Sequence, residues 1–323
     1  MLFSNLLPSA QEKKRKSFLV PEVGQENGYI KDRHLDFIGI GTSRSGSTWL
    51  AEMLVLHPEV FIPRKKEIYY FNRYVRHHKN PNYSKPIEWY WSFFKEAKNY
   101  QIKGEITPAY LVDEQAPKNI YHFNPNIKII VILRNPADRL FSVYLHLIQE
   151  GVINRISFEK FVTTPSFADV LERNFYYKYL KRYFDLFPKE NIKVAFFDDL
   201  IKDKTVFLED IQDFLGIKPF IPPSVNDRLN PAMIPKFLPI NIVLYRIRAF
   251  FRKLNLTSET RLLRHFAQIL AELHDYFALK MVRPFEKKPQ MDEKLRKSLT
   301  NYYLNDIVKL ERLSGKDLSH WKK

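Results

Sequence analysis

The chain has 323 residues, 45% of them apolar, which is enough for a hydrophobic core and argues against a disordered protein. Lysine and arginine number 52 against 36 aspartates and glutamates, so the formal net charge is +16. Such an excess favours an anionic partner, whether nucleic acid, an anionic membrane, an acidic glycan or a phosphorylated cofactor. The sequence has no cysteine, which excludes disulfides, thiolate metal sites and a cysteine nucleophile.

Residues 1–34 are polar and basic, without sustained periodicity, and we predict that they form an arm before a domain that begins at residue 35. The short apolar start "MLFSNLL" precedes the basic run "KKRK", the reverse of the order in a signal peptide. The longest uninterrupted apolar run, 129–133, is far shorter than the ~20 residues of a membrane span. We therefore expect a cytoplasmic protein.

The next stretch combines a predicted strand, a glycine-rich loop and a predicted helix. "LDFIGIG" at 35–41 is typical of a buried strand, and "SGSTWLAEMLVL" has apolar residues at helical spacing. From Gly41 the loop reads G-x-x-x-x-G-S-T, close to the phosphate-binding pattern G-x-x-x-x-G-K-[ST]. Ser47 stands where that pattern has lysine, and the cation of the loop is Arg44. The backbone N–H groups of such a turn favour an anion, with an ordinary glycine–serine turn as the alternative.

Strands and helices then alternate along the chain. Strands are predicted at 101–107, 127–135 and 191–200, and helices at 135–150, 175–187 and 204–216. This alternation predicts a three-layer α/β fold with a central, mostly parallel sheet. Beyond residue 216 follow a proline-rich loop, a helix near 240–254 with interleaved arginines and an amphipathic helix at 291–315, so the C-terminal part is expected to be helical. We expect one domain over 35–323, with its core at 35–216 and substrate-side segments at 217–323.

A second anion site is indicated where the most apolar predicted strand ends. The run "IKIIVIL" is followed by Arg134, and Ser142 lies in the next predicted helix. A nucleoside-triphosphate hydrolase would place an acidic side chain at such a strand end to hold Mg²⁺. An arginine and a serine suit a second phosphate group instead, so we expect no metal. A degenerate P-loop kinase or nucleotide hydrolase, and a non-catalytic nucleic-acid binder, are the alternatives.

Taken together, these motifs resemble the sulfotransferase family, whose donor is 3′-phosphoadenosine 5′-phosphosulfate (PAPS). The resemblance rests on the loop "RSGSTW" (44–49), the pair Arg134 and Ser142, and the ordered stretches "KEIYYFN" (66–72), "EWYWSFF" (88–94) and "GEITPAYL" (104–111). It covers residues 35–216 and is stronger to the heparan-sulfate-type branch and its bacterial members. It implies transfer of a sulfuryl group from PAPS to a hydroxyl or amine of a glycan or glycolipid, with no nucleic-acid partner.

The resemblance also implies roles for individual residues. Glu67 is the expected general base, which takes the proton of the acceptor, and Glu105 is the alternative base. Arg44 is expected to stabilise charge on the leaving phosphate oxygen. The expected nucleotide-binding residues are Arg44, Ser45, Gly46, Ser47, Thr48 and Trp49 at the 5′-phosphosulfate, Arg134 and Ser142 at the 3′-phosphate, and Phe197 at the adenine.

Some features depart from the family pattern. Ile106 replaces a lysine that is common in the heparan-type branch, so Arg44 would carry the leaving-group charge alone. Pro108 occupies the place of the histidine base of other sulfotransferases. "RKKE" at 64–67 would by itself be typical of a solvated charged surface, and the motif context gives Glu67 its role. The arginine-rich segment 240–253 is left open as a lid, an acceptor site or a membrane contact.

Overall fold

The computed structural model describes residues 33–75, 78–99, 101–153, 156–227 and 289–323, together with short pieces at 233–235, 243, 269 and 282–284. Most of the expected N-terminal arm and almost all of the segment 240–253 lie outside the described residues. In the part of the chain that is described, no helix is both long and apolar enough to cross a membrane.

A five-stranded sheet in the order β2-β5-β1-β6-β7 forms the centre of the molecule, and all its pairings are parallel. The strands are β1 (Phe37–Gly41), β2 (Val60–Phe61), β5 (Ile102–Ile106), β6 (Lys128–Leu133) and β7 (Ile192–Phe196). Because β1 is parallel to its neighbours β5 and β6, the segments that follow these three strands all begin at the same edge of the sheet. In open parallel sheets this edge, outside the carboxyl ends of the strands, is where ligands bind.

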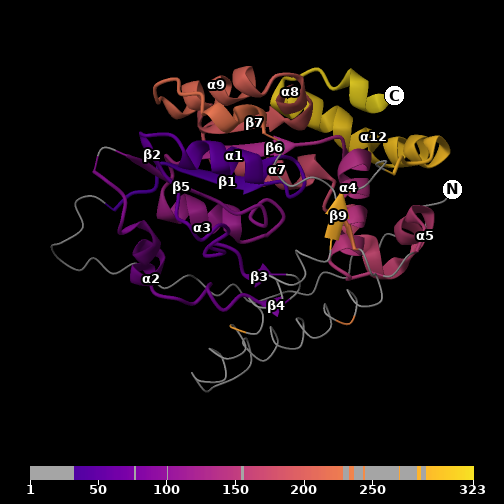
Figure 1. Ribbon diagram of the computed structural model, residues 1–323, viewed down its shortest axis with the longest axis horizontal. Helices are drawn as coiled ribbons and strands as arrows, with labels where there is room; N and C mark the ends of the chain where they lie inside the picture. Colours follow the sequence, from indigo (N-terminus) through magenta and orange to yellow (C-terminus); the bar gives the residue numbers. More distant parts are fainter. Residues whose placement is uncertain are drawn as a thin grey trace.

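Helices cover both faces of the sheet (Figure 1). The helices are α1 (Ser47–Val55), α2 (Ile87–Trp91), α3 (Ala116–Phe123), α4 (Pro136–Gln149), α5 (Phe158–Thr163), α6 (Ala168–Glu172), α7 (Tyr176–Phe184), α8 (Phe197–Lys202), α9 (Lys204–Leu215) and α12 (Glu293–Ser314). Two short antiparallel sheets pair β3 (Tyr74–Val75) with β4 (His78–Lys79) and β8 (Met233–Pro235) with β9 (Val282–Pro284).

The strand β6 shows how one sequence builds two cores. Ile129, Val131 and Leu133 point to the core under α3, α4, α7 and α12, whereas Ile130 and Ile132 point to the core under α1 and α9. Successive side chains of a strand face opposite sides of a sheet, so a nearly all-apolar strand must be covered on both. The sheet is therefore a buried layer, and its carboxyl edge stays open for a site.

The expected three-layer α/β fold is confirmed. The predicted strands and helices of the core are present, and the amphipathic helix at 291–315 is α12. One boundary was wrong, because the strand expected at 191–200 ends at Phe196 and α8 begins at Phe197. Asp198 and Asp199 lie in the first turn of α8, where their negative charges are stabilised by the positive end of the helix dipole.

Candidate active site

The loop between β1 and α1 forms an anion site made of backbone. Gly46 is the N-cap of α1 with φ 95°, and no side chain caps this end of the helix. A Cβ on Gly46 would lie 2.5 Å from a methyl group of Leu200, so both the backbone angle and the packing of α8 require glycine. The first N–H groups of α1 consequently remain available to an anion, as the sequence predicts.

Two arginines, one in α4 and one directly after β6, hold this loop from the side. The buried Arg139 donates from Nε to the backbone oxygen of Ser43 at 2.9 Å and from Nη1 to Asn174 at 2.7 Å. Arg134 donates from Nη1 to the backbone oxygen of Arg44 at 3.3 Å. Arg139 is not among the site residues predicted from the sequence. Its only signal is a charged residue on the buried face of an amphipathic helix.

Arg44 adopts a backbone conformation that is unusual for a residue with a side chain, with φ 67°. Its Nε donates to the hydroxyl of Ser142 at 3.3 Å. The predicted loop cation and the two predicted 3′-phosphate residues therefore meet in one place. Burial lowers the pKa of the Arg44 guanidinium, and nearby Arg134 lowers it further. Two cations that crowd each other in this way favour an anion between them.

The remaining loop residues differ in how their side chains are used. Ser45 is fully buried, and its hydroxyl bonds to that of Thr42 at 2.5 Å, so it can offer a ligand only its backbone. Trp49 is 6% exposed and donates to the backbone oxygen of Val225 at 3.2 Å. Its indole packs in the core under α1, and its contact with the nucleotide stays a prediction.

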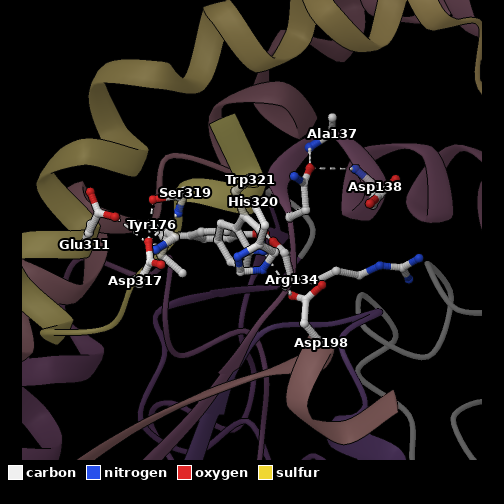
Figure 2. A network of polar contacts seen from close by, with 12 residues as sticks. Arg134, Ala137, Asp138, Tyr176, Asp198, Glu311, Asp317, Ser319, His320 and Trp321 are labelled. Carbon is white, nitrogen blue, oxygen red and sulfur yellow. Dashed lines mark hydrogen bonds and ion pairs between the residues drawn. The ribbon is translucent and has the colours of Figure 1, made fainter. Parts of the chain in front are cut away.

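Arg134 is the centre of a network that reaches the C-terminus (Figure 2). Its backbone oxygen accepts a hydrogen bond from Tyr176 at 2.8 Å, and its guanidinium lies over the ring of Phe197 at 4.6 Å. The neighbour of Phe197, Asp198, accepts a hydrogen bond from Trp321 Nε1 at 3.0 Å. Phe197 is thus at the predicted site, with one ring face already covered by Arg134.

A cavity of about 420 Å³ opens between α4 and the start of α12. Arg134 and Ser142 both line it, together with Met291, Glu293 and an ion pair between Arg296 and Asp138. Asn135 caps α4 by accepting hydrogen bonds from the N–H groups of Ala137 and Asp138, at 3.0 and 3.3 Å. That helix end is therefore satisfied internally, and an anion in the cavity would be bound by side chains. We call the stretch from Arg134 to Ser142 the α4 wall.

The predicted base, Glu67, lies in a segment without helix or strand, residues 62–73, which we call the Glu67 segment. Glu67 has φ 62° and Tyr69 has φ 55°. With Arg44, they are the non-glycine residues of positive φ among those described. Each such residue costs on the order of 1–3 kcal/mol and persists where the surroundings enforce it, often at functional sites. The hydroxyl of Tyr69 donates to the carboxylate of Glu67 and fixes its direction.

Glu105 enforces this conformation from the core. It is 1% exposed and accepts hydrogen bonds from Thr107 at 2.8 Å, Tyr90 at 2.9 Å and Tyr110 at 3.1 Å. The backbone N–H of Ile68, inside the Glu67 segment, also donates to it. Burial raises the pKa of Glu105 to about 7, and these donors partly offset the rise.

Glu105 is therefore a support of the Glu67 segment rather than a group open to an acceptor. Hydroxyl and amide donors fix it in place. From the other side, Asn82 Nδ2 donates to the backbone oxygen of Ile68 at 2.9 Å, and the hydroxyl of Tyr110 accepts from the N–H of Tyr70 at 2.9 Å.

The Glu67 segment touches the phosphate loop directly, because the ammonium of Lys66 donates to the hydroxyl of Thr48 in the first turn of α1. The predicted base and the predicted anion site are therefore neighbours. Ile106, which stands where the resemblance leads one to expect a lysine, is 3% exposed and packs beneath Gly39. Among the described residues, no three acidic, histidine or cysteine side chains are arranged to hold a metal ion.

Comparison with known proteins adds to this geometry. A family model described as "Sulfotransferase domain" matches residues 35–230. Heparan sulfate glucosamine 3-O-sulfotransferase 5 of Mus musculus is 32% identical over 192 residues, which cover 56% of this chain and 53% of that protein. Bifunctional heparan sulfate N-deacetylase/N-sulfotransferase 2 of Homo sapiens is 30% identical over 208 residues, covering 59% of this chain and 23% of that protein. The chain thus matches about half of the first relative and under a quarter of the second.

A solved structure supports the fold. The sulfotransferase from Alicyclobacillus acidocaldarius matches with a TM-score of 0.64 over 90% of this chain and 100% of that chain. Its sequence is 21% identical, so the match bears on the architecture alone.

Proposed function

Since the chain belongs to the sulfotransferase family, we propose that it transfers the sulfuryl group of PAPS to a hydroxyl or amine of a carbohydrate acceptor. The observation that carries this proposal is the meeting of Arg44, Arg134 and Ser142 beside an uncapped helix N-terminus. One anion at α1 and a second at the α4 wall match the two ends of a nucleotide phosphorylated at both 5′ and 3′ positions.

The α4 wall supports recognition of the 3′-phosphate. Arg134 supplies a planar fork of donors suited to phosphate oxygens, and Ser142 supplies a hydroxyl on the same cavity. Phe197 covers the guanidinium of Arg134, and Tyr176 fixes its backbone, so little ordering remains to be done when the nucleotide binds. Adenosine would extend from this wall toward Phe197.

The chemistry asked of the chain is a displacement at sulfur. The acceptor oxygen or nitrogen forms a bond to sulfur, and the bond from sulfur to the bridging phosphate oxygen breaks. The acceptor proton passes to the carboxylate of Glu67, which Tyr69 orients. The electron pair of the broken bond remains on the 5′-phosphate of the product, adenosine 3′,5′-bisphosphate (PAP). Positive groups around the loop stabilise this charge as it develops.

The acceptor is proposed from the relatives. Both relatives described above carry heparan sulfate in their names, and they cover 56% and 59% of this chain. A glycan with amine and hydroxyl groups on glucosamine is therefore the acceptor class to test first. The net charge of +16 suits an acidic glycan. A location in the cytoplasm also stays a prediction.

The direct test is incubation of the full chain with sulfur-35-labelled PAPS and heparan-type oligosaccharides that differ in N- and O-sulfation. We expect label in the oligosaccharide and formation of an equal amount of PAP. Tight binding of PAP without transfer to any of these glycans would overturn the acceptor class. Failure to bind PAP would overturn the donor as well.

A further inference from the structure

The contact between Lys66 and Thr48 places an ammonium at the anion site. Lys66 belongs to the Glu67 segment, after β2, and Thr48 is the second residue of α1. The hydrogen bond from Lys66 Nζ to Thr48 Oγ1 brings the side chain across to the turn whose N–H groups face the predicted anion. An ammonium has three donors, so two remain for a ligand.

Among the described residues, two positions where a sequence motif would place a lysine do not supply one. Ser47 stands where a nucleotide-binding loop has lysine, and Ile106 is buried in the core. Arg44 is the cation of the loop itself, and one of its guanidinium nitrogens, Nε, donates to Ser142 on α4. Lys66 therefore adds a second cation at the loop, from a different segment of the chain.

The surroundings of Lys66 fit a role toward a ligand. Its hydrogen-bond partner is a neutral hydroxyl, so its charge is not already neutralised through that bond. Burial lowers the pKa of its ammonium, while the charges of Glu67 and Glu52 act in the opposite direction. A cation beside the first turn of a helix adds to the positive field of the backbone N–H groups rather than competing with it.

We propose that Lys66 is a catalytic residue that stabilises the bridging oxygen of the 5′-phosphate as its bond to sulfur breaks. The proposal rests on the sulfuryl transfer proposed above. As the acceptor–sulfur bond forms and the proton moves to Glu67, negative charge collects on this oxygen, and Lys66 donates to it. Arg44, whose Nε donates to Ser142, links this end of the site to the 3′-phosphate end. Two adjacent residues, Lys66 and Glu67, thus serve the two sides of one displacement.

The test compares Lys66→Met with Lys65→Met, the same change one residue earlier. The ammonium of Lys65 lies over the rings of Trp89 and Phe93, away from the Thr48 contact. In single-turnover transfer from labelled PAPS, Lys66→Met should be slower by ~10²–10³, the usual effect of removing one donor to a developing oxyanion. Lys65→Met should stay within about threefold of wild type, because the Lys65 ammonium contacts aromatic rings and not the phosphate loop.

A binding measurement separates catalysis from mere tethering of the Glu67 segment. PAP carries on the 5′-phosphate a charge that PAPS does not carry on the bridging oxygen. Lys66→Met should therefore weaken PAP by about tenfold or more, the usual scale for a hydrogen bond to a charged group. It should weaken PAPS by much less. Equal loss of both affinities, or none, would overturn the proposal.

Lys66→Arg gives the second control, because it keeps a cation with N–H donors at this position. If Lys66 acts on the donor through its charge, Lys66→Arg should recover much of the transfer that Lys66→Met loses. A loss in Lys66→Arg equal to that in Lys66→Met would overturn the proposal. Equal rates of transfer by wild type and Lys66→Met would refute the role of Lys66 and leave the proposed function standing. No transfer by wild type would refute the proposed function itself.

Discussion

The α4 wall and the Glu67 segment bound the same site but are built by different means. The α4 wall follows a central strand and includes the capped start of a helix, and it contacts α12 and, through Tyr176, α7. The Glu67 segment has no regular structure and contains two residues of positive φ. Its shape depends on polar contacts from Glu105, Tyr110, Asn80 and Asn82.

This difference separates binding from reactivity. Apolar packing and helix caps hold the groups expected at the nucleotide, which must be the same in every turnover. The expected base is held in a strained conformation by a buried carboxylate, which acts through directional bonds. Changes at the α4 wall should therefore alter nucleotide affinity, and changes at the Glu67 segment should alter turnover or its dependence on pH.

The largest effect is expected at Glu67. Glu67→Gln keeps the size of the side chain but cannot take a proton, so turnover should fall by ~10²–10⁴, the usual size of a general-base contribution. Affinity for PAP should change little, because the α4 wall is intact. The check is single-turnover transfer together with calorimetric titration of PAP. Near-normal transfer by Glu67→Gln would show that the base lies elsewhere.

The next effect concerns Glu105 and pH. Burial raises its pKa from 4.5 to about 7, so the folded protein keeps a proton that the unfolded chain loses between these values. The free energy of unfolding should therefore decrease as pH rises from about 4.5 to 7 and level off above. The full contribution is about 3 kcal/mol, because one pKa unit corresponds to about 1.4 kcal/mol.

Glu105→Gln removes that titration. Unfolding by urea at pH 5, 6, 7 and 8 should show the wild type losing stability relative to the variant as pH rises. Turnover of Glu105→Gln should fall far less than that of Glu67→Gln, because Glu105 acts through the Glu67 segment. Parallel stability curves for the two proteins would contradict the buried-carboxyl account. Abolished transfer in a folded Glu105→Gln would contradict its supporting role.

Arg134→Ala tests the α4 wall. Loss of the guanidinium removes a charged contact to the 3′-phosphate, worth about 1.5–3 kcal/mol, or roughly 10- to 150-fold in PAP affinity. Adenosine 5′-phosphate, which lacks the 3′-phosphate, should bind wild type and variant with similar affinity. Equal weakening of both nucleotides would indicate that Arg134 supports the loop through Arg44 instead.

The smallest effect is expected at Trp321, near the C-terminus of the chain, which is linked to the α4 wall only indirectly. Trp321→Phe removes the hydrogen bond to Asp198, which is partly exposed and can be solvated in its place. Stability should fall by about 1 kcal/mol, the usual net value of one hydrogen bond. PAP affinity should change by less than about threefold, since one such bond acts only indirectly on Arg134. Thermal unfolding measures the change in stability, and a PAP titration measures the change in affinity. A large loss of PAP affinity would show that the C-terminal residues belong to the nucleotide site.

The two regions also differ in how far the sequence predicts them. Apolar strands and the spacing of α1, α4 and α12 follow from local periodicity, so Gly46, Arg134 and Ser142 could be placed from the sequence. The contacts of Lys66 with Thr48 and of Glu105 with Ile68 join segments that are distant or irregular, and no periodicity encodes them. Lys66 looked like part of a solvated charged run, and Glu105 like an alternative base. Trp49 was expected at the 5′-phosphosulfate. Its side chain is buried instead by contacts with α9 and residue 225, which the local sequence does not encode.

The central claim is that the loop after β1 and the α4 wall form a site for a nucleotide with phosphates at its 5′ and 3′ ends, rather than for a triphosphate with Mg²⁺. The most direct measurement is a titration of the full chain with PAP in EDTA and with ATP in excess Mg²⁺. We expect PAP to bind at least about tenfold more tightly than ATP, the contribution of one charged contact, and EDTA to leave PAP binding unchanged. ATP with Mg²⁺ binding as tightly as PAP, or loss of PAP binding in EDTA, would contradict the account.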